Sequence, residues 1–471
     1  MDLAAPPRRP DRNREVAAAP AGEIRSLTGL RIVAAVWVVC FHFSSAPGET
    51  YSAYWAPLRP LIRQGALGVD LFFVLSGFVI TLTYLDQLGR RPTARATAQF
   101  WWARICRIWP VHAVITTLFG GWLLYKSTRV TDGVLAYQTV QPVVDLAHWV
   151  EQLLMVQLWH RPFHDGSSWS GPAWSISAEW LAYACFPFLV CLLWRLRDAP
   201  AVVTGLLAVG CMLPLAYVAL TPGEGAVPYL WLLRIAGGFL AGAFTCLAVR
   251  RMPRGERTDR LATGVAVLVV AEVLLVLWWS DALGGSRGAV AAVTFPVLIG
   301  ALALSTRGIS RWLSTETMVV GGRISFALYL VHIPVFEIVY TLMGWYPRLA
   351  PGSTLGALLL PHALLVTLPL AWLVHRYLEE PARRWLRPRG PERWWGGGRV
   401  DPAPSARRVG TGAPHGVLAA VRHGQDTTDR WPVPARGAVV PRPPVHATAG
   451  HDRPTGRPAV PTRRPADRLP S

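Results

Sequence analysis

The chain has 471 residues, of which 52% are hydrophobic and only 16% charged, and its formal net charge is +19. A soluble domain devotes about a quarter of its residues to charged side chains, so this composition indicates an integral membrane protein. The 10% aromatic content excludes disorder throughout, and six cysteines without a repeated spacing exclude a disulfide scaffold.

Ten apolar segments are long enough to cross the bilayer, which takes roughly 20 helical residues. They begin near residues 28, 66, 105, 172, 200, 227, 261, 288, 318 and 355. Arginines cluster in alternate connections, so the positive-inside rule places both termini in the cytoplasm. We therefore predict an all-α integral membrane protein of about ten transmembrane helices, multi-pass in the plasma membrane with the lipid bilayer as partner. The first span could instead be the apolar region of a signal peptide.

The termini and the longest connection differ from the spans. Residues 1–26 are predicted to form a cytoplasmic N-terminal segment and 27–387 the multi-span domain. Residues 388–471, with 14 Arg, 6 acidic residues and no apolar periodicity, read as a disordered tail rich in Arg and Pro. Within the 126–171 connection, residues 145–159 resemble an amphipathic helix. No nucleic-acid partner is predicted, because the basic stretches lack interleaved aromatics.

The first span carries two ionisable residues, Arg31 and His42. An ionisable group at the centre of a membrane helix costs at least about 2.5 kcal/mol, so each is a functional candidate. Eleven residues separate them, which is about 20° around a helix and roughly 16 Å along it, so they share one face. Alternatively, Arg31 reaches the headgroups and His42 forms a structural hydrogen bond between helices.

The second and third spans add an acid and two arginines. Asp70 opens the second span, ahead of Ser76 and Gly77, and the glycine is equally explained as a helix-packing position. Arg104 and Arg107 stand three residues apart at the start of the third span. Guanidinium groups bind phosphate in a bidentate fashion, although both arginines could simply anchor the helix.

The fourth and ninth spans complete a polar set. Glu179 lies roughly 10 Å below one end of its span and His42 roughly 17 Å above the other end of its own, so their depths in a bilayer about 30 Å thick agree. A histidine and a carboxylate at matched depth could act as a base and the group that orients it. We expect a polar cavity in the bundle, lined by Ser76, Trp174, Ser175, Ser177, Tyr329 and His332.

Five elements in this order resemble a known family. They are Leu27-Thr-Gly-Leu-Arg31 with His42, Gly68-Val-Asp-Leu-Phe-Phe-Val-Leu-Ser-Gly-Phe78, the Arg104 and Arg107 pair before Pro110, Trp174-Ser-Ile-Ser-Ala-Glu179, and Leu328-Tyr-Leu-Val-His332. Tyr377-Leu-Glu-Glu-Pro381 is similar to the closing segment of the same family. The chain resembles the membrane-bound acyltransferase family 3, whose members O-acylate sugars and other hydroxyl compounds.

The resemblance implies acyl-CoA as a co-substrate, with no permanently bound cofactor. Carried onto this chain, it implies that His42 is the catalytic histidine, Arg31 its partner, and Arg104 with Arg107 the donor-binding pair. The chain departs from the family pattern at Thr28, Trp180, Phe326 and Ala327, which bears on acceptor identity more than on the chemistry.

We expect an enzyme that moves an acyl group, acetyl or another short chain, from acyl-CoA to a hydroxyl of a glycan, glycolipid or secondary metabolite. His42 would act as general base, with Glu179 or Asp70 orienting its imidazole; a covalent acyl-histidine route is an alternative. No metal site is predicted, because the two histidines come from separate helices without a second ligand at binding spacing. One alternative is a secondary transporter, but the inverted repeat that is common in transporters is not visible. Another is an inactive scaffold subunit of a cell-envelope glycan assembly system. The intact set of Arg31, His42 and Glu179 argues against the second alternative.

Overall fold

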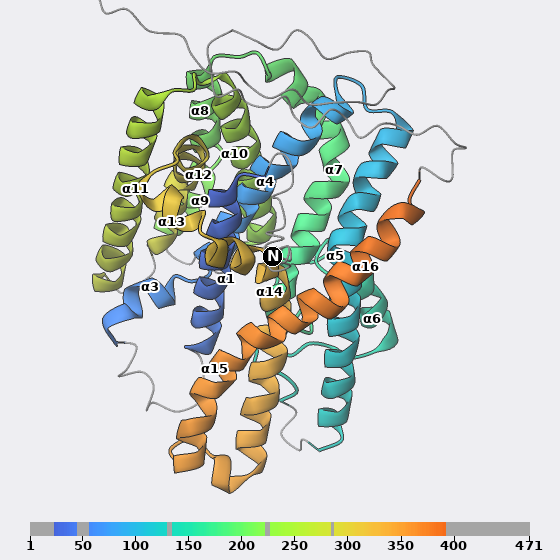
Figure 1. Ribbon diagram of the computed structural model, residues 1–471. Helices are drawn as coiled ribbons and strands as arrows, with labels where there is room; N and C mark the ends of the chain where they lie inside the picture. The colour runs from blue at the N-terminus through green and yellow to red at the C-terminus, as the bar shows by residue number, and fades with distance from the viewer. Residues whose placement is uncertain (1–22, 45–55, 130–133, 222–226, 284–286, 392–471) are drawn as a thin grey trace, which may run out of the picture. The chain divides into compact units, whose positions relative to one another are not determined.

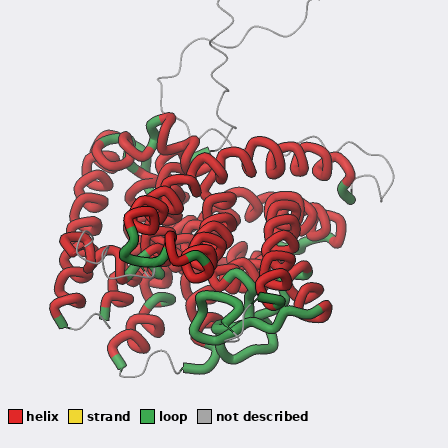
Figure 2. Tube along the Cα trace, turned by 90° about the horizontal axis from the view of Figure 1, so that it is seen from below, coloured by secondary structure: helices red, strands yellow, loops and turns green. Residues whose placement is uncertain are grey.

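The computed structural model describes residues 23–44, 56–129, 134–221, 227–283 and 287–391, and helices are the only regular elements in these ranges. Figure 1 shows their arrangement, and Figure 2 shows helix along nearly all of the described trace, with the loops gathered mainly in one region. Most of the predicted 1–26 segment and of the 388–471 tail, including its disorder, lies outside the described residues. The all-α membrane fold is confirmed.

Nine helical segments within the described ranges are long and apolar enough to cross a membrane. Six of them are single helices: α1 (Arg25–Phe43), α4 (Leu67–Leu88), α5 (Ala94–Ser127), α10 (Leu230–Arg251), α11 (Glu256–Ala282) and α14 (Glu316–Trp345). The other three run from Gly171 to Leu196, from Ala201 to Leu220 and from Thr354 to Arg389. They contain α7 (Trp174–Leu196), α8 (Ala201–Gly210) with α9 (Leu213–Leu220), and α15 (Thr354–Val374) with α16 (Glu380–Leu386).

The tenth expected span, near residue 288, is shorter than the others. The apolar segment there is Gly288–Leu304, a 3-10 stretch followed by α12 (Phe295–Leu304). The span near residue 200 is also interrupted, because Pro214 in the first turn of α9 has no backbone N–H to continue α8. The remaining helices are short: α3 (Arg59–Arg63), α6 (Leu146–Leu153) and α13 (Gly308–Leu313).

The helix pair α4 and α10 packs closely because small residues face each other. A Cβ atom on Gly77 would lie 2.0 Å from the Phe239 carbonyl oxygen, and one on Gly242 would lie 1.9 Å from the Val74 carbonyl oxygen. Neither position tolerates a side chain, since backbone stands on the other side. The helix-packing interpretation of Gly77 is therefore confirmed.

Ion pairs close both ends of the same helix pair. Asp70 pairs with Arg234 at 2.8 Å, and Asp86 pairs with Arg250 at 2.7 Å. Asp86 follows Asp70 along α4 by as many residues as Arg250 follows Arg234 along α10. The two helices therefore run parallel. The first pair is buried and the second is exposed, so the two pairs differ mainly in their surroundings.

The predicted helix at 145–159 is shorter than expected, since α6 ends at Leu153. The chain then turns through Met155, whose φ of 57° lies in the left-handed region. The 134–171 connection is tied to the bundle by Glu337 on α14, which accepts hydrogen bonds from the Lys126 ammonium at 3.0 Å and the Tyr137 backbone N–H at 2.8 Å. Lys126 is the only lysine of the chain, and it is buried.

Candidate active site

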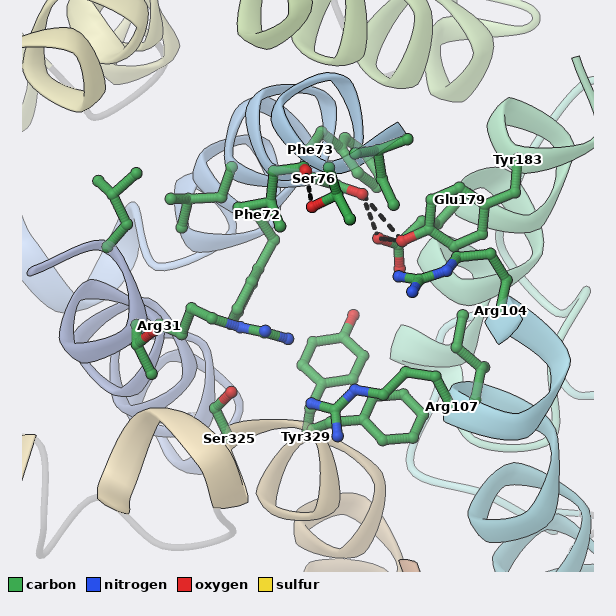
Figure 3. Close-up of a pocket in the computed structure, with 18 of the residues that line it drawn as sticks. Arg31, Phe72, Phe73, Ser76, Arg104, Arg107, Glu179, Tyr183, Ser325 and Tyr329 are labelled. Carbon is green, nitrogen blue, oxygen red and sulfur yellow. Dashed lines mark hydrogen bonds between the residues drawn. The ribbon is translucent and has the colours of Figure 1, made fainter. Parts of the chain in front are cut away.

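A cavity of about 220 Å³ lies between α1, α4, α5, α7 and α14. Three arginines from two helices line it, and we therefore call it the arginine cavity; they are Arg31, Arg104 and Arg107. The lining also includes Ser76, Glu179, Tyr183 and Ser325. Figure 3 shows these side chains converging from opposite walls. The structure thus brings together most of the polar residues that the sequence singled out, although they come from distant parts of the chain.

Arg31 points into this cavity from α1 (Figure 3). Its guanidinium makes no hydrogen bond or ion pair with any residue that the structure describes. A half-buried cation without a counter-ion is costly unless a bound anion compensates it. The arrangement therefore suits an anionic ligand or a reaction in which negative charge develops.

Arg104 and Arg107 enter from the neighbouring helix α5. Arg104 donates to the Tyr84 hydroxyl at 3.0 Å and lies over the Tyr84 ring, while its buried Nε has no partner within the described ranges. Arg107 pairs with Glu379, which lies in a π-helical turn after α15. In the sequence, Glu379 stood out only as part of a family segment; the signal that could have found it is a carboxylate close to an apolar span.

Glu179 faces the arginine cavity but does not orient His42. Its Oε1 accepts hydrogen bonds from the Ser76 hydroxyl at 2.6 Å and the Tyr183 hydroxyl at 2.5 Å. Matched depth was the basis for the predicted pair, and depth along a helix does not fix which neighbouring helix a side chain meets. The prediction that Glu179 contacts His42 is wrong for this structure.

His42 lies in a second cavity, of about 400 Å³, which we call the histidine cavity. Its imidazole Nδ1 is 3.2 Å from Nε2 of His332, which is fully buried behind it and lines neither cavity. With hydrogen on Nδ1, His42 donates to His332 and keeps Nε2 as a proton acceptor. His332 therefore occupies the orienting position that the sequence analysis gave to a carboxylate.

Asp70 does not reach His42 either. Both of its carboxylate oxygens are hydrogen-bonded by Arg234, at 2.9 and 2.8 Å, and Arg234 lies 5.0 Å from the Trp174 ring centroid. Asp70 lines neither cavity, whereas Trp174 and Arg234 line the histidine cavity. Asp70 is the counter-ion of Arg234. Arg234 was not singled out from the sequence, although it lies inside an apolar span.

Tyr329 separates the two cavities. It and Val69 are the residues that line both. The Tyr329 hydroxyl donates to the Pro172 carbonyl at 2.8 Å and lies 2.7 Å from the Ser175 hydroxyl. Ser177, expected in the cavity, lines neither: its hydroxyl accepts from the Leu158 backbone N–H at 3.3 Å.

Comparison with known proteins decides the family. A family described as an acyltransferase domain matches residues 24–376, which is most of the chain. The chain belongs to the membrane-bound acyltransferase family 3. It is therefore an acyltransferase that transfers groups other than aminoacyl groups, in a multi-pass membrane fold, and the transporter and scaffold alternatives are set aside.

Named relatives agree with this assignment. The chain is 27% identical over 405 residues to acyltransferase MdmB of Streptomyces mycarofaciens, covering 82% of this chain and 98% of that protein. It is 23% identical to nodulation protein 10 of Rhizobium leguminosarum bv. viciae, covering 59% and 74%. Identity to O-acetyltransferase OatA of Staphylococcus aureus is 21%, over 76% of this chain and 57% of that protein. No solved structure matches the chain.

Among the described residues, no group of three or more His, Cys, Asp or Glu side chains is placed so that it could hold a metal ion.

Proposed function

We propose that this membrane O-acyltransferase takes an acyl group, acetyl or another short chain, from acyl-CoA and transfers it to a hydroxyl of a glycan, glycolipid or secondary metabolite. The observation that carries the donor assignment is the arginine cavity. Three guanidinium groups face one space, and among the described residues Arg31 makes no ion pair and the Arg104 Nε has no hydrogen-bond partner. The phosphates of CoA are the anions that such a set binds well.

The acceptor would bind in the histidine cavity, beside His42. Its hydroxyl oxygen attacks the thioester carbonyl while His42 Nε2 takes the hydroxyl proton, and the C–S bond breaks to release CoA thiolate, which recovers that proton. His332 holds the His42 ring through their 3.2 Å hydrogen bond. This is the role that an orienting group plays beside a general base. The covalent acyl-histidine route uses the same residue as nucleophile.

The reacting carbon would lie near the wall between the two cavities. Val69 and Tyr329 are the shared lining residues, so a donor held by its phosphates would extend its thioester arm toward Tyr329. Arg31 then either holds phosphate or stabilises the oxyanion that forms on the carbonyl oxygen. The name of the relative O-acetyltransferase OatA supports an acetyl group and an oxygen acceptor.

Both termini are proposed to be cytoplasmic, in a plasma membrane. The arginine-rich connections support this orientation, because positively charged loops are retained on the cytoplasmic side. The arginine cavity is lined by the N-terminal half of α1 and by most of the length of α4, whereas the histidine cavity is lined by the C-terminal end of α1 and the start of α4. In this orientation the donor enters from the cytoplasm.

The test is a pair of substitutions in protein purified in lipid nanodiscs, with free thiol release from acetyl-CoA as the readout. Arg31→Gln should raise the KM for acetyl-CoA, and the exposed control Arg311→Gln should not. His42→Gln should lower kcat by about 10² to 10⁴, the usual contribution of a general base. Full turnover of folded His42→Gln protein would remove His42 from the mechanism, and an unchanged KM in Arg31→Gln would remove Arg31 from donor binding.

A further inference from the structure

The last helix of the described chain sends one buried carboxylate into the bundle. Segment Thr354–Arg389 is among the least buried spans, with 22% of its most apolar window inside the protein. Glu379, in contrast, is only 2% exposed. A buried charge at the edge of a bundle is costly and is weak evidence for a role in stability, so its position asks for another explanation.

The backbone around Glu379 is locally irregular. Residues His375–Glu379 form a π-helical turn between α15 and α16, and Pro381 follows in the first turn of α16. Proline has no N–H to donate back to residue 377, and its ring crowds that carbonyl, so the regular hydrogen-bond pattern cannot continue here. Single π-turns within helices occur often at functional sites.

Both oxygens of the Glu379 carboxylate are engaged. Oε1 accepts from Arg107 Nη1, and Oε2 is 2.8 Å from His375 Nδ1. Because a carboxylate only accepts, His375 donates from Nδ1. The contact uses one nitrogen of the Arg107 guanidinium and leaves its other N–H groups toward the arginine cavity, which Arg107 lines. Figure 3 shows the Arg107 side chain reaching that cavity from α5.

We propose that Glu379 is a positioning residue for the donor: it holds the Arg107 guanidinium in the geometry that receives a CoA phosphate, and His375 holds Glu379. The proposal rests on the proposed acyl-CoA donor. A long, unbranched arginine side chain has many rotamers, and fixing one of them in advance lowers the entropy lost on binding. The segment around the π-turn thereby belongs to the donor site, although Glu379 does not line the cavity.

The chain supplies a matched control in the next residue. Glu380 is also paired with arginine, at 2.8 Å to Arg384, but its side chain is 26% exposed and it makes no contact with Arg107 that the structure records. Both carboxylates become amides of the same size in Glu379→Gln and Glu380→Gln. A difference between the two variants reports on the contact with Arg107 rather than on loss of charge in this segment.

The experiment measures the KM for acetyl-CoA, the KM for the acceptor, and CoA binding by calorimetry, all in nanodiscs. Glu379→Gln should raise the acetyl-CoA KM about tenfold, as expected when a charge-assisted hydrogen bond is lost, with an unchanged acceptor KM. Glu380→Gln should match wild type. In an Arg107→Ala background, Glu379→Gln should have no further effect on the donor KM, because Glu379 acts through Arg107.

Three results for a folded Glu379→Gln variant would overturn the positioning role. The first is a wild-type KM for acetyl-CoA, and the second is an equal change in the KM for acetyl-CoA and the KM for the acceptor. The third is tighter donor binding, which would mean that the carboxylate competes with the donor. If Glu379→Gln does not fold, His375→Phe serves instead, because it removes only the contact between His375 and Glu379. This variant should also raise the donor KM, but by a smaller factor than Glu379→Gln. In that case a folded His375→Phe variant with wild-type donor KM would overturn the positioning role. Wild-type protein that binds no CoA would instead refute the proposed donor itself.

Discussion

Replacing Asp70 by Asn should destabilise the protein far more than the same change at Asp86. The two residues lie on one helix, face the same partner helix and pair with arginine at 2.8 and 2.7 Å. Their exposures differ: the Asp70 side chain is 2% exposed and that of Asp86 is 59% exposed. The comparison therefore isolates the effect of burial on an ion pair.

The expected magnitudes follow from that difference. Removing one partner of a buried pair costs about 3 to 5 kcal/mol, because the other charge stays in a poorly solvated site. Arg234 keeps its hydrogen bond to the Ala66 carbonyl, so we expect the lower figure of about 3 kcal/mol, or more than a hundredfold in the folding equilibrium. Loss of an exposed pair such as Asp86–Arg250 costs less than about 1 kcal/mol.

The assay is reversible unfolding of purified protein in mixed detergent, followed by tryptophan fluorescence. Adding Arg234→Gln to Asp70→Asn should recover part of the loss, since the unpaired charge is then removed. Equal destabilisation by Asp70→Asn and Asp86→Asn would refute the reasoning, and so would a double variant as unstable as the sum of its single changes.

Three further predictions concern packing, accessibility and orientation. Gly77→Ala should abolish stable folding, because its Cβ would meet backbone, whereas Gly264→Ala on α11 has open space around it and should be neutral. Thermal unfolding of both variants checks this prediction. A stable Gly77→Ala protein would contradict the close contact. Lys126 is 4% exposed, so mass spectrometry should find it unmodified after an amine-reactive reagent has labelled the native protein, and modified after denaturation. A cysteine at Arg254 should resist an impermeant thiol reagent added outside intact cells and one at Leu146 should react; the reverse pattern would invert the proposed orientation.

Sequence patterns were sufficient for most of the helices and for many of the polar residues, although Arg234 and Glu379 were missed. Apolar length predicted the spans because a helix in lipid satisfies its own backbone, whatever its neighbours are. Arg31, Arg104 and Arg107 could be chosen for a similar reason, since the cost of a charge in a membrane depends on the residue itself. These three side chains do share one cavity.

Partners were not predictable in the same way. Asp70 and Glu179 were both assigned to His42, yet Asp70 binds Arg234 and Glu179 binds Ser76 and Tyr183. Which helices become neighbours depends on long-range packing, such as the glycine contact between α4 and α10, and no spacing within one span encodes it. Helix periodicity assigns a residue to a face, and tertiary packing then determines what lies opposite.

The wall between the two cavities also has a consequence for membrane permeability. The cavities lie toward opposite ends of α1, and the described residues common to both linings are Val69 and Tyr329. These two side chains therefore lie where the two spaces come closest. Shortening Tyr329 to Ala would join the two spaces into one hydrated path, so cells that express this variant should lose part of their proton gradient. We therefore expect a small side chain at position 329 to make the membrane leaky, whatever Tyr329 contributes to acyl transfer.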